Sequence, residues 1–328
     1  MKPCAYLRPE TVEEATAAHV AHPGAHYLGG GTNLVDLMKL GVTTPDTLVD
    51  ISRLPLDGVT PLPDGALRIG ATVRNSDLAA HPAVRGRWPL VSQALLAGAS
   101  EQLRNTATTG GNLLQRTRCP YFQDLTQPCN KRLPGSGCAA LERVHRDHAV
   151  LGHSRHCIAT HPSDLSVALT AADATVALYG PDGGREIAVE ALHRLPGGRP
   201  EQDTVIRPGE LITAVTLPAH GAALPSVFRK VRDRASFAFA LASVAAVLDV
   251  RDGRVRHVAL AFGGLAHRPW RARRAEAALV GAEPTAAAVD RAVDAELAQA
   301  RPLRDNAYKT RLARNLAREA LTRLVAAR

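Results

Sequence analysis

Two short glycine-rich segments constrain the fold of this chain more than any other feature. The first, "YLGGGTN" at residues 27–33, follows a β-rich run and precedes a helical pattern that Gly41 ends. The next β-rich run, "TLVDIS" at 47–52, completes a strand–loop–helix–strand order, which predicts a small, mostly parallel sheet. The second segment, "TATTGGN" at 106–112, follows a predicted strand at 65–73 and a predicted helix at 89–99.

Both segments have the chemistry of a phosphate-binding site. Glycines let the backbone approach an anion closely, and successive N–H groups form a concave binding surface. Threonine and asparagine side chains hydrogen-bond phosphate oxygens, and a helix N-terminus favours negative charge. Asp50 stands where a Rossmann fold places its ribose-binding acid, but the GGG spacing differs from G-x-G-x-x-G and disfavours NAD. Two such segments indicate a dinucleotide, with two plain tight turns as the alternative.

The rest of the chain predicts two β-hairpins and a helical end. "ATVALYGPDGGREIAV" (174–189) and "SVAAVLDVRDGRVRHVALAFGG" each join two β-rich runs by a turn. The segment "HGAALP" (220–225) has the composition of a linker, so we predict a domain boundary near residue 222. Apolar residues every four positions predict a packed helix face in the last segment: Tyr308, Leu312, Leu316, Ala320 and Leu324.

The positive charge of the chain lies in its last third. Residues 223–328 hold 20 Lys or Arg against 10 Asp or Glu, and residues 1–222 hold 20 against 21. A solvated helix surface explains this, and an acidic partner or electron acceptor is the alternative. Nucleic acid is disfavoured because aromatic residues are 4% and no nucleic-acid motif is present. The uncharged run at 235–248 is too short to span a bilayer, so we expect buried core and no membrane insertion.

Four of the five cysteines fall within 39 residues: Cys119, Cys129, Cys138 and Cys157. Nine, eight and 18 residues separate them, without the paired C-x-x-C of a structural zinc site. No export signal is visible at the N-terminus, which argues against disulfides. Unrelated buried thiols are the simplest alternative, but the Pro-, Gly-, Asn- and Gln-rich surroundings disfavour burial. Four thiolates around an iron–sulfur cluster remain the hypothesis.

Other metal-binding side chains near these cysteines receive no predicted ligand role. Mixed Cys/His zinc ligation is conceivable, but a partly exposed His-rich loop explains the five histidines at positions 145, 148, 153, 156 and 161. Cys4 stands far away at the N-terminus, and we expect it to be unrelated.

The blocks "LGGGTNLVDLMKLG", "ASEQLRNTATTGGNLLQRTRCPYF", "CIATHPSDLSVAL" and "RKVRDRASFAFALASVAAVL" together resemble the FAD-binding subunits of the xanthine oxidase family of molybdenum hydroxylases. The resemblance covers nearly the whole chain. The insertion "CNKRLPGSGCAALERVHRDHAVLG" is its most specific part, because it is similar to the [4Fe–4S]-containing flavin subunits of periplasmic aldehyde oxidoreductases.

The resemblance implies an α+β fold. It has a FAD-binding domain at 1–222, in subdomains 1–55 and 56–222 with an iron–sulfur insertion at 114–158. A C-terminal domain of antiparallel sheet and helices follows at 223–328. The implied FAD contacts are Tyr27, Leu28, Gly29, Gly30, Gly31, Thr32, Asn33, Leu34, Thr108, Gly110, Gly111, Asn112, Asp164, Leu211 and Lys230. Leu211 and Lys230 match positions near the flavin ring, where a cation stabilises the anionic reduced flavin. The four cysteines of the insertion region match the cluster ligands.

The implied function is electron transfer within a heterotrimer that oxidises aldehydes. A molybdopterin-containing large subunit and a small [2Fe–2S] subunit are the implied partners, and oxygen, a quinone or a small redox protein is the implied acceptor. No catalytic residue for the substrate is expected in this chain. Two alternatives are a subunit similar to that of 4-hydroxybenzoyl-CoA reductase and a non-enzymatic zinc-binding assembly protein. The resemblance implies a periplasmic location through a partner's twin-arginine signal, with the cytoplasm as the alternative.

Overall fold

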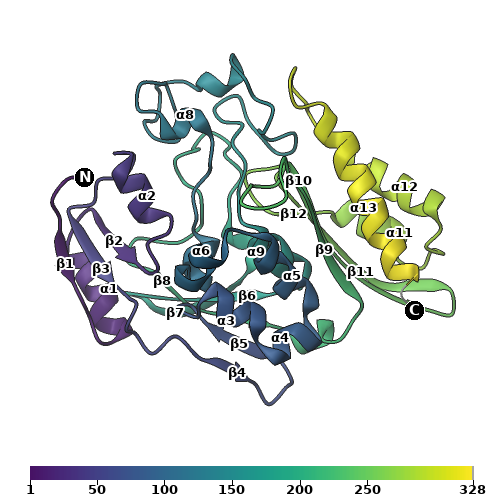
Figure 1. Cartoon of the computed structure of the whole chain (residues 1–328), viewed down its shortest axis with the longest axis horizontal. Coiled ribbons are helices and arrows are strands. Elements are labelled where there is room, and N and C mark those ends of the chain that lie inside the picture. The colour runs from purple at the N-terminus through teal and green to yellow at the C-terminus, as the bar shows by residue number, and fades with distance from the viewer. Residues whose placement is uncertain (327–328) are drawn as a thin grey trace.

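The computed structural model describes residues 1–326 and contains three sheets (Figure 1). The first sheet is parallel throughout, in the order β1-β3-β2, as predicted for the N-terminal segment. Its strands and helices are β1 (Ala5–Leu7), α1 (Val12–Ala21), β2 (Ala25–Leu28), α2 (Leu34–Lys39) and β3 (Thr47–Asp50). Asp50 accepts hydrogen bonds from the Tyr6 hydroxyl and, at 2.9 Å, from the Ser52 N–H, so it has a structural role at the end of β3.

The second sheet is antiparallel, in the order β4-β5-β8-β6-β7, and helices pack on it. The predicted hairpin is confirmed as the pair β6–β7. The strands are β4 (Val59–Pro61), β5 (Leu67–Gly70), β6 (Thr175–Gly180), β7 (Gly183–Ala188) and β8 (Leu211–Leu217). The helices are α3 (Asn75–Ala80), α4 (Pro82–Arg87), α5 (Pro89–Ala97), α6 (Glu101–Thr106), α7 (Thr109–Leu113), α9 (Asp164–Ala171) and α10 (Val189–Leu192). Trp88, Ile69 and Val176 are fully buried in the core between them.

Residues 114–158 form a lobe with little regular structure, at the top of the view in Figure 1. Its short helices are α8 (Pro120–Gln123) and the 3₁₀ turn η1 (Ala139–Leu141). The composition of this segment disfavoured burial, and that expectation is wrong for its centre. Phe122 is fully buried, and Cys129 and Cys157 are also buried. Arg132 explains part of this order, since its guanidinium donates to three carbonyl oxygens of residues 121, 122 and 127.

The C-terminal part is an antiparallel sheet, β12-β11-β10-β9, with the C-terminal helices against one face and α5 and α9 against the other. A short turn η2 (Ala219–Gly221) leads into it. The predicted second hairpin is confirmed as β10–β11. The elements are β9 (Ser226–Val231), β10 (Ala242–Arg251), β11 (Arg254–Gly263), β12 (Trp270–Arg271), α11 (Arg273–Leu279), α12 (Ala286–Leu297) and α13 (Tyr308–Ala326). In α13, Leu316, Ala320 and Leu324 are buried as expected. The fold class predicted from the sequence, α+β in two domains, is confirmed.

One prediction about the core is wrong. The run 235–248 was expected to be buried throughout, but only its second half forms the buried strand β10. Residues 235–240 lie in the loop before that strand, and Phe237 and Phe239 are about half exposed. Arg234 and Arg118 stack on these two rings, which gives the aromatic side chains partners without a core.

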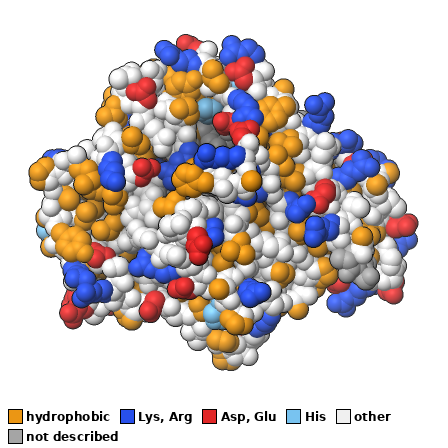
Figure 2. Space-filling view, in the orientation of Figure 1, with side chains coloured by type: hydrophobic (Ala, Val, Ile, Leu, Met, Phe, Trp, Pro, Cys, Tyr) orange, Lys and Arg blue, Asp and Glu red, His pale blue; other side chains and the backbone are white. Residues whose placement is uncertain are grey.

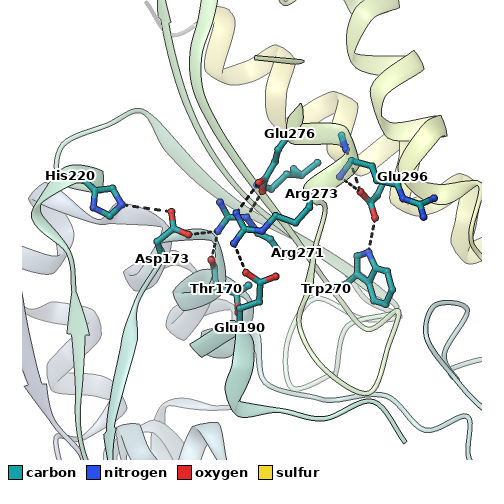
Figure 3. Close-up of polar contacts among 12 residues, drawn as sticks. Thr170, Asp173, Glu190, His220, Trp270, Arg271, Arg273, Glu276 and Glu296 are labelled. Atoms are coloured by element: carbon teal, nitrogen blue, oxygen red, sulfur yellow. Dashed lines mark hydrogen bonds and ion pairs between the residues drawn. The ribbon is translucent and has the colours of Figure 1, made fainter. Parts of the chain in front are cut away.

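Ion pairs join the C-terminal sheet to the preceding part of the chain, as Figure 3 shows. The buried Arg271 donates to the Thr170 carbonyl at 2.6 Å and to Asp173 at 2.8 Å, and it also pairs with Glu276. Arg273 contacts Glu190 from the same side. Arg271 is 2% exposed and its charge is shared between two carboxylates, so this contact adds a directional link to the apolar core that the C-terminal sheet shares with α5 and α9. None of the helices within residues 1–326 combines the length and the apolar character needed to cross a bilayer.

Candidate functional site

The two glycine segments come together on one cavity. A cavity of about 710 Å³ is lined by residues of both, and the second segment contributes Thr108, Gly110 and Gly111. The first segment contributes Tyr27, Gly29, Gly30, Gly31, Thr32, Asn33 and Leu34. The sheet positions these segments, since the first leaves the end of β2 and the second begins α7. In Figure 2 the face is hollowed below the lobe formed by residues 114–158, and Lys and Arg side chains border the hollow.

The glycines are required because the two segments touch through their backbones. A Cβ on Gly30 would stand 2.0 Å from the Thr106 carbonyl oxygen, a separation that no real structure permits. A Cβ on Gly29 would stand 3.0 Å from the Thr108 hydroxyl. Gly31 has φ +71°, which favours glycine. Closely packed glycine backbone of this kind is suited to a diphosphate ligand.

Asn33 supplies a free donor at this cavity. Its side-chain oxygen accepts the Arg116 N–H at 2.9 Å, which fixes the orientation of the amide. Its Nδ2 is buried without a partner within the protein. A buried donor without an acceptor is costly, so the amide is suited to a ligand oxygen. Arg116, Arg194 and Arg207 also line the cavity, together with Glu201, Asp203 and Glu210, so its wall carries charges of both signs.

Most of the predicted FAD contacts reach this cavity, and a few do not. Leu211, at the start of β8, lines it together with the glycines. Leu28, Asn112, Asp164 and Lys230 are absent from its lining. Asn112 lies next to the cavity-lining Gly111, and its Oδ1 accepts the Ser163 hydroxyl at 2.6 Å.

Asp164 and Lys230 form a buried ion pair beside this site. Lys230 Nζ lies 2.7 Å from Asp164 Oδ2 and donates to the Ala97 carbonyl at 3.1 Å. Both side chains are less than 10% exposed. Burial raises the pKa of Asp164, and the attraction of Lys230 opposes that rise. The predicted contact of these two residues with the flavin stays a prediction.

The four cysteines of the insertion region converge on a second, small cavity: Cys119, Cys129, Cys138 and Cys157 line it. All four are free thiols, and Cys4 lies apart before β1. Within residues 1–326, no group of three or more His, Cys, Asp or Glu side chains is placed to hold a metal ion. Four sulfurs around one zinc would each stand about 2.3 Å from it. A four-iron cluster spreads its thiolates around a cube and holds them farther apart.

The surroundings of these sulfurs favour a thiolate at Cys138 and disfavour one at Cys119 and Cys157. Cys138 has its pKa lowered to about 6, first by a hydrogen bond with Cys157 and then by backbone N–H groups. The same contact raises the pKa of Cys157, so the first proton lost belongs to the pair. Burial raises the pKa of Cys119 to about 12, against backbone N–H donors from residues 121 and 122. A bound cation would reverse this burial effect, because metal coordination deprotonates a thiol.

Two of the five histidines depart from the expected, partly exposed loop. His145 and His148 are buried, and His148 Nε2 lies 3.2 Å from Cys119 Sγ. His161 is half-buried, and its ring lies tilted against that of His193, with the ring centroids 4.1 Å apart; His193 is a residue that the sequence did not single out. Burial lowers the pKa of His148 to about 4 and of His193 to about 4. These rings are therefore neutral at pH 7.

A network of one buried and two part-exposed charged side chains joins the two cavities. Lys131, whose side chain is 2% exposed, lies at the cysteine cavity and pairs with Asp203. Arg116 Nε donates to the second oxygen of Asp203 at 2.8 Å, and both of these residues line the glycine cavity. Sequence reasoning missed all three residues. Lys131 lies between two predicted ligands, but Asp203 is more than 70 positions away and carries no local signal.

We expect Asp203→Asn to destabilise the protein by about 3 kcal/mol at pH 7, because it leaves the Lys131 charge buried without its counter-ion. Burial raises the pKa of Asp203, but Lys131 and Arg116 outweigh burial and hold that pKa well below its usual range. The stability from Asp203 is therefore present above its unfolded pKa of about 3.9 and is lost as the pH falls toward the lower folded pKa.

Urea unfolding at pH 7 and at pH values from 4.5 to 2.5 measures both effects. The difference in unfolding free energy between Asp203→Asn and the unmodified protein is expected to shrink as the pH falls. Asp182→Asn is the matched control, since the Asp182 side chain is 86% exposed and lies 3.8 Å from Arg207. Equal stability of the two variants at pH 7 would contradict the role of the network.

Comparison with known proteins identifies the family of the chain. Residues 2–220 match the family described as "FAD binding domain in molybdopterin dehydrogenase". The chain is a FAD-binding medium subunit of the molybdenum hydroxylase family. Residues 226–324 of this medium subunit match the "CO dehydrogenase flavoprotein C-terminal domain". The family resemblance seen in the sequence is confirmed, and the subunit belongs to an oxidoreductase.

Individual relatives cover nearly all of this medium subunit. It is 52% identical over 316 residues to the aldehyde oxidoreductase FAD-binding subunit PaoB of Escherichia coli K12, covering 96% of each chain. It is 27% identical to the glyceraldehyde dehydrogenase medium chain of Sulfolobus acidocaldarius, covering 84% of this chain and 80% of that one. Among solved structures, carbon monoxide dehydrogenase from Hydrogenophaga pseudoflava superposes with a TM-score of 0.78 at 28% identity, over 99% of both chains.

Proposed function

We propose that this medium subunit carries FAD and a [4Fe–4S] cluster and transfers electrons within a heterotrimeric, molybdenum-dependent aldehyde oxidoreductase. The 52% identity to the aldehyde oxidoreductase FAD-binding subunit PaoB over 96% of both chains is the observation that carries this proposal. The shared cavity of the two glycine segments and its free Asn33 donor support FAD. The convergence of four free cysteines on one small cavity supports the cluster.

In the proposed assembly, a large subunit with the molybdopterin cofactor converts an aldehyde and water into a carboxylic acid, two protons and two electrons. A small subunit with [2Fe–2S] clusters relays the electrons to this chain. FAD, when bound, accepts them and passes them to oxygen, a quinone or a small redox protein. The residues of this chain hold and orient the cofactor, so none of them acts on the aldehyde.

Cys119, Cys129, Cys138 and Cys157 would hold the [4Fe–4S] cluster, which supplies one-electron chemistry when bound. Three roles fit its place beside the flavin site: an electron exit, a side reservoir, or a structural clamp on the insertion. The Lys131–Asp203–Arg116 network gives each of them a physical connection to the glycine cavity. The proposed location is the periplasm, reached by co-export on a partner's twin-arginine signal, with the cytoplasm as the alternative.

Co-purification with the partner subunits, followed by flavin, iron and molybdenum analysis, tests the proposal. We expect one FAD and four iron atoms per chain beyond the iron of the small subunit, and turnover of aromatic aldehydes. Turnover of CoA thioesters instead would favour a reductase similar to 4-hydroxybenzoyl-CoA reductase. A colourless, zinc-containing preparation would favour an assembly protein and reject the proposal.

A further inference from the structure

Two histidines place a ring nitrogen against a cysteine sulfur at the small cavity. His148 Nε2 lies 3.2 Å from Cys119 Sγ, and His267 Nε2 lies 3.2 Å from Cys157 Sγ. His148 belongs to the insertion, whereas His267 belongs to the loop between β11 and β12 of the C-terminal domain. Both rings are buried, with 4% and 7% of their surface exposed. Two of the four sulfurs are therefore contacted by imidazole, from different domains.

The surroundings of each imidazole ring decide whether Nδ1 or Nε2 carries the proton. Nδ1 of His148 and Nδ1 of His267 are both buried without a hydrogen-bond partner. A neutral imidazole has one N–H, on either nitrogen. A proton on Nδ1 would be a buried donor without an acceptor, and Nε2 would then direct its lone pair at a sulfur. A proton on Nε2 instead gives an N–H···S hydrogen bond, so each ring donates to its sulfur.

We propose that His148 and His267 are positioning residues that raise the reduction potential of the cluster, acting through Cys119 and Cys157. The inference rests on the proposed [4Fe–4S] function. One-electron reduction makes the cluster and its thiolates more negative by one charge. An N–H donor stabilises that added charge more than it stabilises the oxidised state, so reduction becomes more favourable.

Lys131 does not replace these donors. Its ammonium lies at the same cavity, but its hydrogen bonds go to Asp203 and to the Pro200 carbonyl. The Asp203 carboxylate offsets much of that positive charge. The imidazole N–H groups are therefore the side-chain donors aimed at the sulfurs among the described residues. Since His267 comes from the C-terminal domain, docking of that domain also sets the potential.

The test is an EPR-monitored titration with dithionite and mediators, on the purified complex with its partner subunits. At a fixed ambient potential, His148→Leu and His267→Leu are each expected to lower the ratio of reduced to oxidised cluster about tenfold. His148→Gln and His267→Gln, which retain an N–H near the Nε2 position, are expected to restore most of it. His153→Leu is the matched control, because His153 Nε2 lies 2.8 Å from the Arg301 carbonyl oxygen and contacts no sulfur. The flavin potential should be unchanged in all variants.

Iron analysis separates the two possible failures. Absence of four extra iron atoms in the unmodified complex would reject the proposed function. Full iron in both Leu variants with an unchanged potential would overturn the inference alone. If the Leu variants lose the cluster, pulsed EPR of the unmodified complex with ¹⁵N-histidine in H₂O and D₂O decides. A weakly coupled histidine with an exchangeable proton supports the inference, whereas no coupling, or the strong coupling of direct iron ligation, overturns it.

Discussion

Cys129→Ser is expected to remove the [4Fe–4S] cluster and its broad visible absorption while the flavin stays bound. Cys129 is 7% exposed, and its backbone pairs with that of Cys138 in an isolated β-bridge, so its sulfur is fixed on the cavity wall. Serine keeps the size but offers a hydroxyl with a far higher pKa than a thiol, which makes it a poor cluster ligand. We expect about four fewer iron atoms per chain and an unchanged FAD content.

Cys4→Ser is the matched control for that variant. Cys4 is the remaining cysteine, it is partly exposed, and it lies before β1 rather than at the cavity. Its substitution should leave the iron content and the absorption of the complex unchanged. Full iron and full absorption in Cys129→Ser would show that the ligand assignment is wrong, whatever the other three cysteines do.

The local elements were predictable because short-range patterns decide them. Alternating β-rich runs around a turn specified both hairpins, and the strand–glycine–helix order specified the parallel sheet. The sequence predicted that both glycine segments bind phosphate, but it did not predict the contact between them. Nothing local indicates that Gly30 lies against the Thr106 carbonyl, since 76 positions separate them.

The insertion shows where composition misleads. Polar and glycine-rich sequence predicts exposure because such residues gain little from burial. Here Arg132 donates hydrogen bonds to backbone carbonyls, and Asn130 accepts hydrogen bonds from backbone N–H groups. The segment therefore packs without a large apolar core. Asn130 Oδ1 alone accepts the N–H groups of Gly135 and Gly137, and its Nδ2 donates to the His156 carbonyl. Such a network is specified by geometry, which hydrophobic periodicity does not report.

The opposite error, at residues 235–240, has a similar cause. An uncharged run predicts burial, but the run crosses the boundary between a loop and β10. Arginines 118 and 234 come from outside that run and cover its two phenylalanines, so their partners could not be found by scanning the run itself. His267 illustrates the same limit at the cysteine cavity, because it is 110 positions from the sulfur that it contacts.

Gly30→Ala is expected to lower the FAD content of the purified complex more than tenfold. The added Cβ would stand 2.0 Å from the Thr106 carbonyl oxygen and 3.1 Å from Ala107 Cα, and both are backbone atoms that no side-chain rotation can move away. The two glycine segments must therefore separate, which displaces the cavity wall that they form together and the Asn33 amide, whose Nδ2 has no partner within the protein. Flavin released by acid from the purified protein, measured by fluorescence, gives the FAD content.

Gly86→Ala is the control that separates loss of the site from the generic effect of a methyl group. Gly86 lies within α4 without a positive φ, and a Cβ there would meet no atom within 4 Å. The same substitution should therefore leave FAD content unchanged and stabilise the helix by about 0.5–1 kcal/mol. If Gly30→Ala bound FAD as well as Gly86→Ala does, with both folded by circular dichroism, then the contact between the two segments would not form the FAD site. In that case the ligand cavity would have to be sought elsewhere, beginning with the Asp164–Lys230 pair that lies outside the cavity lining.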